Sequence, residues 1–132
     1  MRREAPNLLT EAEWRIMKIV WELGQGTSRQ VHEIASERHQ WASTTVKTML
    51  SNLVAKGLLQ ARLDGNKYIY RPTTPALKTL TRAADQFMDK SVDTLKGQLL
   101  CYMAQKVALT PTDIDELQGI IDEQRRREKA KP

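Results

Sequence analysis

Apolar residues recur at helical spacing along the first part of this 132-residue chain. Thr10 and Glu13 have the spacing of a capping box, which predicts a first helix that begins just after Thr10. Gly24-Gln25-Gly26 predicts its end, and a second, short helix is expected to begin at Thr27 or Ser28. The expected apolar residues of the first helix are Trp14, Ile16, Met17, Val20, Trp21 and Leu23.

A third amphipathic helix is predicted from about Ser43 to Lys56, with Gly57 as its C-terminal cap. Its inward stripe follows spacings of three and four: Val46, Met49, Leu50, Leu53 and Val54. The period then changes, and residues 59–63 and 68–72 are typical of two short strands. The connector Asp64-Gly65-Asn66-Lys67 predicts a hairpin, because Gly and Asn tolerate positive φ.

Pro72, Thr73, Thr74 and Pro75 indicate a domain boundary, so we expect one domain at residues 1–73 and another at 74–132. Three further helices are predicted in the second domain: from Thr74-Pro75, from Ser91 to Val107, and from Thr110-Pro111. The residues expected to be buried on them are Leu77, Leu80, Ala84, Phe87, Val92, Leu95, Leu99, Met103, Ile114, Leu117 and Ile121. These amphipathic helices expose more apolar surface than one short segment can bury, which favours dimerisation.

Three helices followed by a hairpin is the order of a winged helix-turn-helix, an architecture that binds DNA. The predicted fold class is therefore mainly α with a small β-hairpin. It consists of a winged helix-turn-helix DNA-binding domain and a C-terminal α-helical dimerisation segment.

The solvent face of the third predicted helix has a composition that suits DNA. With the apolar stripe buried, its exposed residues are Thr44, Thr45, Lys47, Thr48, Ser51 and Asn52. No acidic residue occurs between Gln40 and Leu63, so phosphate is not repelled. Hydroxyls and amides bond base edges or phosphates. The predicted hairpin adds residues suited to backbone or minor-groove contact: Arg62, Asn66 and Lys67.

Two other interpretations of this surface stay open. The small hydroxyl residues can be ordinary surface positions beside a hairpin that only caps the fold, or the winged helix can bind a protein instead of DNA. The charge favours DNA: the chain has 21 Lys and Arg against 16 Asp and Glu, a net charge of +5. Residues 1–73 hold 11 of the basic and 7 of the acidic residues, so the excess lies mostly in the predicted DNA-binding domain.

Catalytic and metal-binding patterns are missing from the sequence. It has no Gly-rich phosphate loop, zinc-ligand spacing or nucleophile and base set, so we expect no enzyme activity, no cofactor and no metal. His32 and His39 are spaced poorly for a shared metal and are expected to be structural or solvated. The single Cys101 fits a reducing cytoplasm, and no apolar run approaches the roughly 20 residues that span a bilayer, so no membrane partner is expected.

Several segments carry a resemblance to the penicillinase-repressor family, which also includes copper-responsive repressors. They are Ala12-Glu13-Trp14 through Trp21, Trp41 with Thr44-Thr45-Val46-Lys47-Thr48, Leu53 through Lys56-Gly57, and Ile114-Asp115-Glu116-Leu117. The resemblance covers about residues 8–122. It implies a homodimer that represses transcription from an inverted-repeat DNA operator, with entwined C-terminal helices.

The resemblance also implies roles for individual residues. Segment 41–57 corresponds to the recognition helix and its lead-in, so the implied contacts are Thr45, Lys47, Thr48, Ser51 and Asn52. The penicillinase type often has Arg at the position of Asn52, and this departure implies a different operator base there.

The signal that releases the repressor is less clear from the family pattern. β-Lactam-responsive members are cleaved by a protease between Asn and Phe in the middle dimerisation helix, where this chain has Cys101-Tyr102. Copper-responsive members carry Cys-x-Cys pairs, which this sequence lacks. Leu23-Gly24-Gln25 and Tyr68-Ile69-Tyr70 are more similar to the copper branch. We therefore expect control of a copper-transport operon, with a β-lactam-resistance repressor released by proteolysis near Cys101-Tyr102 as the alternative.

Cys101 has a structural and a functional interpretation. It lies near the apolar stripe of its predicted helix, so a buried core thiol is expected. The alternative is a Cu(I) or redox ligand that acts with Met103 or with the partner subunit's Cys101.

Overall fold

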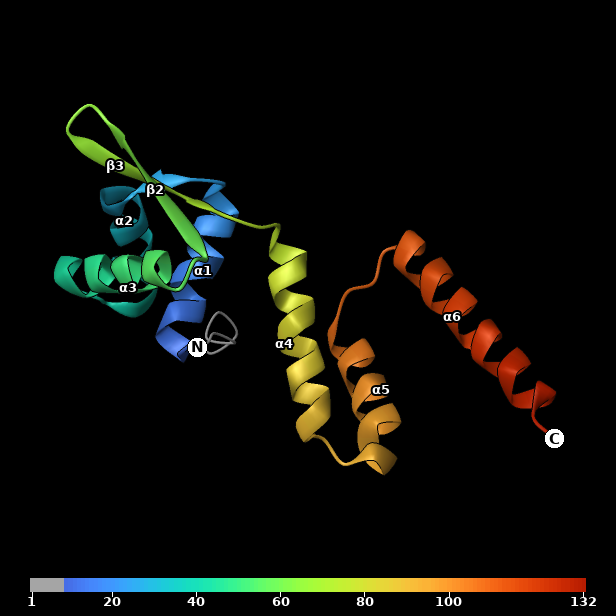
Figure 1. The fold of residues 1–132 in the computed structure, drawn as a ribbon. Coiled ribbons are helices and arrows are strands. Elements are labelled where there is room, and N and C mark those ends of the chain that lie inside the picture. The colour runs from blue at the N-terminus through green and yellow to red at the C-terminus, as the bar shows by residue number, and fades with distance from the viewer. Residues whose placement is uncertain (1–8) are drawn as a thin grey trace. The chain divides into compact units, whose positions relative to one another are not determined.

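The computed structural model describes residues 9–132, which form six α-helices, one short 3₁₀ helix and three strands (Figure 1). The elements are α1 (Glu11–Leu23), β1 (Gly26–Thr27), α2 (Ser28–His39), α3 (Ser43–Ala55), β2 (Leu59–Asp64), β3 (Lys67–Pro72), α4 (Ala76–Lys90), η2 (Asp93–Leu95), α5 (Lys96–Lys106) and α6 (Pro111–Ala130). The chain divides into two compact units, one ending at Phe87 and one beginning at Met88. This division falls inside α4, and the expected boundary between residues 73 and 74 stays a prediction.

The first two helices begin with complete capping boxes. The Thr10 hydroxyl accepts from the Glu13 amide at 3.1 Å, and the Glu13 carboxylate accepts from the Thr10 amide at 2.9 Å. Thr27 and Gln30 repeat the arrangement at α2, so Thr27 is the N-cap of that helix and Ser28 is its first residue. Each box satisfies two backbone donors that a helix start leaves without intrahelical partners.

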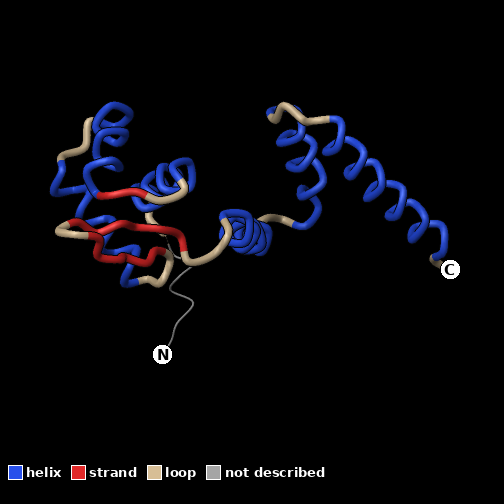
Figure 2. The backbone as a smooth tube through the Cα atoms, turned by 90° about the horizontal axis from the view of Figure 1, so that it is seen from above, coloured by secondary structure: helices blue, strands red, loops and turns tan. Residues whose placement is uncertain are grey.

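The hairpin of β2 and β3, which we call the wing, belongs to a three-stranded antiparallel sheet in the order β1-β3-β2 (Figure 2). Its two-residue turn is Gly65-Asn66, and Gly65 has a φ of 67°, which suits glycine. The sequence predicted only a hairpin and missed β1, where Gly26 pairs with Tyr70 and Thr27 with Ile69. A strand of two residues is too short to show a period of two.

The core of the first unit lies between α1, α2, α3 and the start of β2. Its fully buried large side chains are Ile16, Met17, Ile19, Leu50, Leu53, Leu59, Val20, Val31 and Val46. This set confirms most of the predicted inward residues of α1 and α3, and the structure adds Ile19. Leu23, which was predicted to belong to the apolar face of α1, is 38% exposed. Trp14 and Trp21 are only partly buried, and their rings lie 6.2 Å apart.

A buried ion pair joins the start of α1 to the end of α3. The Lys56 ammonium donates to the Glu13 carboxylate at 2.6 Å, and the Glu13 side chain is 3% exposed. Burial raises the pKa of Glu13, but hydrogen bonds from Lys56 and from the Thr10 amide outweigh it, so the pKa lies below its ordinary value. The ionised Glu13 therefore stabilises the folded chain.

We expect Glu13→Gln to lower the free energy of unfolding at pH 7 by about 1–3 kcal/mol, because Lys56 loses its charged partner in a buried setting. A lowered folded-state pKa contributes stability above the unfolded pKa, and this stability is lost as pH falls through the folded value. In urea titrations between pH 7 and about pH 3, the wild type should therefore converge with Glu13→Gln below the ordinary Glu value of 4.5.

Glu11→Gln is the matched control, because Glu11 is exposed and pairs with Arg15 on the surface. It should change the unfolding free energy by no more than about 0.5 kcal/mol at any pH. An equal pH dependence for the two variants would show that Glu13 has no special role.

Two of the last three helices begin later than predicted. α4 begins at Ala76, one residue after Pro75, and α5 begins at Lys96, because residues 93–95 form a 3₁₀ turn instead of the predicted start at Ser91. α6 begins as predicted, with Thr110 and Asp113 in a capping box. Among residues 9–132 no helix is long and apolar enough to cross a bilayer.

The apolar faces of these helices are not buried in the single chain. No residue of α5 or α6 is buried, although Ile114, Leu117 and Ile121 were expected to be, and Ile114 remains 51% exposed. The large apolar side chains that stay exposed in α4 to α6 are Leu77, Leu80, Phe87, Met88, Val92, Leu95, Leu100, Tyr102, Met103, Val107, Ile114, Ile120 and Ile121. The predicted burial is therefore wrong for an isolated chain.

Candidate nucleic-acid interface

The outer face of α3 is polar and exposed. All six predicted residues are exposed: Thr44, Thr45, Lys47, Thr48, Ser51 and Asn52. Val46, Leu50 and Leu53 are buried beneath them and fix which side of the helix faces solvent. The predicted exposure is confirmed, and DNA contact by these residues stays a prediction.

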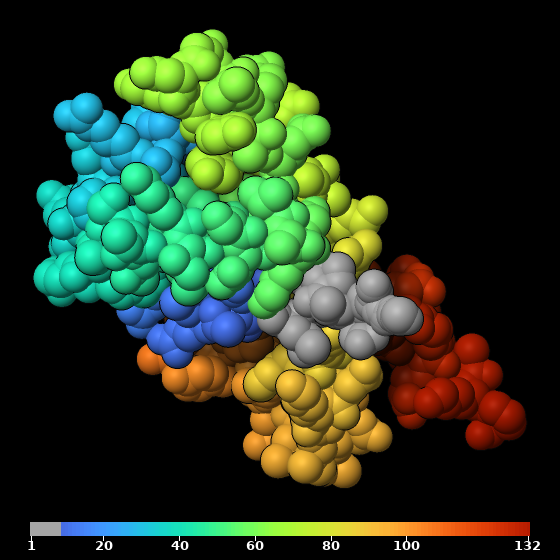
Figure 3. Space-filling view, turned by 60° about the vertical axis from the view of Figure 1, so that its left-hand side comes forward, coloured from blue at the N-terminus to red at the C-terminus, as the bar shows by residue number. Residues whose placement is uncertain are grey.

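The wing lies beside α3 on the same accessible face of the molecule (Figure 3). Asn66 is in its turn and Lys67 begins β3, and both are exposed. Arg62 is also exposed but pairs in register with Ile69, so it lies on the opposite face of the hairpin from Leu63 and Tyr68.

A groove of about 450 Å³ separates the start of α2, the outer side of α3 and the wing. We call it the cationic groove, and its lining residues are Thr27, Ser28, Arg29, Lys47, Ser51, Asn66, Lys67, Tyr68 and Tyr70. Four of the nine predicted DNA contacts line it: Lys47, Ser51, Asn66 and Lys67. The fold thus brings residues of α3 and of the wing together at one site.

Thr44, Thr45, Thr48, Asn52 and Arg62 are not among the groove residues. The four on α3 continue the polar face away from the groove, where a helix laid in the major groove presents side chains to base edges.

Arg29 and Tyr68 also line the groove, although neither was among the nine predicted DNA contacts. The signal for Arg29 was its position just after the N-cap of α2, since the start of a helix favours phosphate. Tyr68 has no such signal, because an aromatic residue in a strand usually indicates packing.

The lead-in to α3 is held by two histidines. His32 Nε2 donates to the Trp41 carbonyl at 3.2 Å, and the His39 ring lies 4.9 Å from the Trp41 ring. Arg15 donates to His39 Nδ1, and burial followed by repulsion from nearby cations, Arg15 first, lowers the pKa of His39. The expectation for the two histidines was a structural or a solvated side chain, and both make contacts at the lead-in to α3 or with α1.

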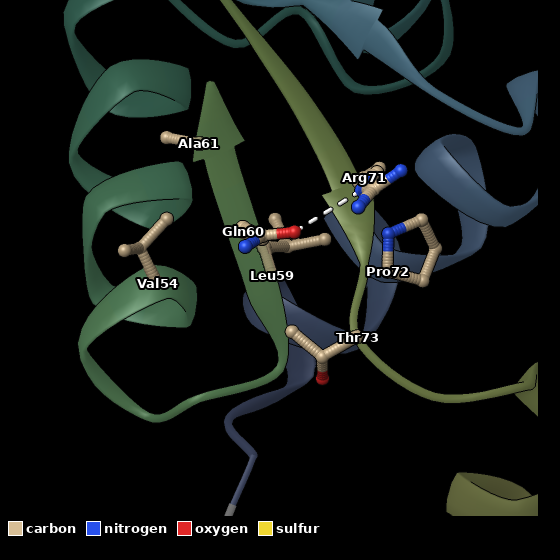
Figure 4. A pocket seen from close by; sticks show the side chains of 7 residues that line it. All are labelled: Val54, Leu59, Gln60, Ala61, Arg71, Pro72 and Thr73. Carbon is tan, nitrogen blue, oxygen red and sulfur yellow. Dashed lines mark hydrogen bonds between the residues drawn. The ribbon is translucent and has the colours of Figure 1, made fainter.

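A second cavity of about 600 Å³ lies at the base of the wing, next to the C-terminal part of α3. Figure 4 shows Val54, Leu59 and Ala61 beside it, and the Arg71 guanidinium donating to Gln60 Oε1 at 3.1 Å across the hairpin. This cross-strand bond fixes Arg71 at the base of the wing, away from the turn that bears Asn66.

Cys101 and Tyr102 are both exposed on α5, so the expected burial of the Cys101 thiol is wrong for the single chain. Lys106 lies over the Tyr102 ring, 5.3 Å from its centre. Within residues 9–132 no three His, Cys, Asp or Glu side chains gather as metal ligands would.

Comparison with known proteins identifies the chain's relatives. The family model "Penicillinase repressor" matches residues 9–123. An uncharacterised 16.5 kDa protein of Latilactobacillus sakei is 32% identical over 89% of this chain and 81% of its own length. The penicillinase repressor of Bacillus licheniformis is 23% identical over 92% of this chain and 94% of its own length.

Among solved structures, a MarR mutant from E. coli complexed with operator DNA has a TM-score of 0.50 and 14% identity. The match covers 87% of this chain and 74% of that chain, and it shows a shared fold. The order of α1, α2, α3 and the wing is that of a winged helix-turn-helix. Because the family model spans most of the sequence, this chain belongs to the penicillinase repressor family, a family of transcriptional repressors.

Proposed function

We propose that the protein represses transcription by binding an inverted-repeat DNA operator as a homodimer in the cytoplasm. The observation that carries this proposal is the exposed, acid-free face of α3 beside the wing. Such a face can enter the major groove without repelling phosphate, while the wing contacts the flanking backbone. Membership of a repressor family supports the same function.

Under this proposal some of the polar side chains contact bases and others contact phosphates. Thr45, Thr48 and Asn52 face base edges, since hydroxyls and amides can donate to and accept from bases. Lys47, Arg62 and Lys67 bind phosphates and supply affinity without sequence preference. Thr44, Ser51 and Asn66 add hydrogen bonds at the edges of this interface.

The experiment that tests DNA recognition is a salt titration of binding to the duplex upstream of the protein's own gene, compared with a scrambled duplex. We expect tight binding to the promoter duplex, falling steeply with salt because bound phosphates release counterions. Equal, weak binding to both duplexes would contradict the proposal. A winged helix that binds protein would then be the better interpretation.

Asn52→Ala and Lys67→Ala should have different effects. Loss of a base contact at Asn52 should reduce discrimination between promoter and scrambled duplexes by about 5- to 100-fold. Loss of Lys67 should weaken binding to both duplexes by the same factor and reduce the slope of log K against log salt by about 0.9. Fluorescence anisotropy at several salt concentrations measures both quantities. If each variant lost affinity for the promoter and scrambled duplexes by the same factor, the assigned roles would be wrong.

The homodimer is proposed from the exposed apolar faces of the C-terminal helices. Val92, Leu95 and Val107 are each more than half exposed, and no residue of α5 or α6 is buried. Monomeric proteins rarely expose large contiguous apolar patches. A second copy is the partner that the family resemblance implies, and two copies match the two halves of an inverted repeat.

We expect the wild type to sediment as a dimer at micromolar concentration and Ile114→Glu to be at least about 100-fold weaker in dimerisation, because a charge enters an apolar interface. Asp115→Asn, an exposed position on the same helix, is the control and should remain dimeric. Analytical ultracentrifugation distinguishes the states. A monomeric wild type, or equal dimerisation of both variants, would count against this face.

We propose that the protein controls a copper-transport operon and that copper is the inducing signal. The support is the similarity of Leu23-Gly24-Gln25 and Tyr68-Ile69-Tyr70 to the copper-responsive branch of the family. Release by proteolysis near Cys101-Tyr102 is the second candidate, and the exposure of both residues favours it. Adding Cu(I) to the promoter complex tests the first: dissociation supports a copper signal. A stable complex with Cu(I), together with cleavage in α5 after β-lactam induction in cells, supports the second.

A further inference from the structure

Positive side chains from three separate elements of the first unit line the cationic groove. Arg29 lies in the first turn of α2, Lys47 in α3 and Lys67 at the start of β3. These residues lie far apart in the sequence, so only the fold places them around one groove. No carboxylate is among the groove's lining residues.

Within residues 9–132 none of these three cations forms an ion pair, a state that they share with Lys18, Arg62 and Arg71. Arg15, Arg38 and Lys56, by contrast, each pair with a glutamate at 2.6–2.8 Å. Like charges that face one groove repel, and a polyanion in the groove would remove this repulsion.

The other groove residues also suit phosphate oxygens. Ser28, Ser51 and Asn66 offer hydroxyl and amide donors. The wall at Ser28 and Arg29 is the start of α2, where the helix dipole favours a negative group. Donors that come from α2, α3 and the wing can contact several phosphates of one chain at the same time.

We propose that the cationic groove seats the phosphodiester backbone of one strand of duplex DNA, and that Arg29 is a phosphate-binding residue of the repressor. This inference rests on the proposed function, because α3 in the major groove brings the flanking backbone between α2 and the wing. It extends the interface to α2, which supplies none of the contacts proposed above.

The test is a salt titration with the full-length protein and two duplexes of about 30 base pairs, one random in sequence and one from upstream of its gene. Arg29→Ala should weaken binding to both duplexes by the same factor, about 3- to 10-fold near 0.1 M salt. It should also reduce the slope of log K against log salt by about 0.9. Arg29→Lys should keep the slope.

Arg38→Ala is the matched control, since Arg38 lies on the same helix but pairs with Glu22 and does not line the groove. It should leave the salt slope unchanged. Equal slopes for Arg29→Ala and Arg38→Ala would overturn the inference, as would a loss confined to the promoter duplex. Because the random duplex reports phosphate contact alone, a failure to recognise the promoter affects the proposed function and not this result.

Discussion

Lys47→Glu is expected to reduce affinity for the promoter duplex by about 100-fold near 0.1 M salt. Lys47 lies on the exposed side of α3 and lines the groove shared with the wing. The substitution removes the phosphate contact proposed for Lys47 and places a carboxylate where the proposal puts the phosphates. Random-sequence DNA should lose a similar factor, since phosphate contacts carry little sequence information.

Lys18→Glu makes the same charge change at an exposed position of α1 that does not line the groove. Since separated surface charges are screened, it should cost no more than about threefold under the same conditions. Anisotropy titrations compare the loss of DNA affinity in the two variants, and circular dichroism verifies that both are folded. Equal small losses would favour a winged helix that binds protein.

Leu50→Ala should lower the free energy of unfolding by about 2–5 kcal/mol, because it deletes a fully buried side chain and leaves a cavity. Leu50 lies on the inner face of α3, against the core formed with α1 and α2. A loss of this size is a large fraction of the stability of a small domain. Urea unfolding followed by circular dichroism measures it.

Thr44→Ala, on the exposed side of the same helix, is the control and should stay within about 0.5 kcal/mol of the wild type. If Leu50→Ala cost less than about 1 kcal/mol, the inner face of α3 would not be packed as the structure shows.

The first unit could be predicted closely because its signals are local and strong. Each of four signals fixes one boundary: the capping box at Thr10, the N-cap residues Thr27 and Ser28, the stripe ending at Val54 and the glycine in the 64–67 connector. The sequence did not indicate β1, whose two residues depend on pairing with β3, a contact made by distant residues.

The candidate site shows the same division between local and distant information. The polar face of α3 follows from helical period alone, so its exposed residues could be named in advance. Arg29 lies near Lys47 and Lys67 only because α2 packs against α3 and the sheet. The spacing of residues in the sequence does not indicate this packing. The C-terminal helices were identified by their period, but burial of Ile114 and Cys101 depends on a partner that the single chain does not supply.

If two chains pair through the exposed apolar residues of α5 and α6, as proposed, this pairing sets how sharply the promoter responds to the amount of protein. Where free monomers predominate, the concentration of paired chains rises with the square of the total, by mass action. Halving the amount of protein would then lower operator occupancy about fourfold at low occupancy. A cell could open the promoter by a modest change in synthesis or turnover, without a ligand that binds the repressor tightly.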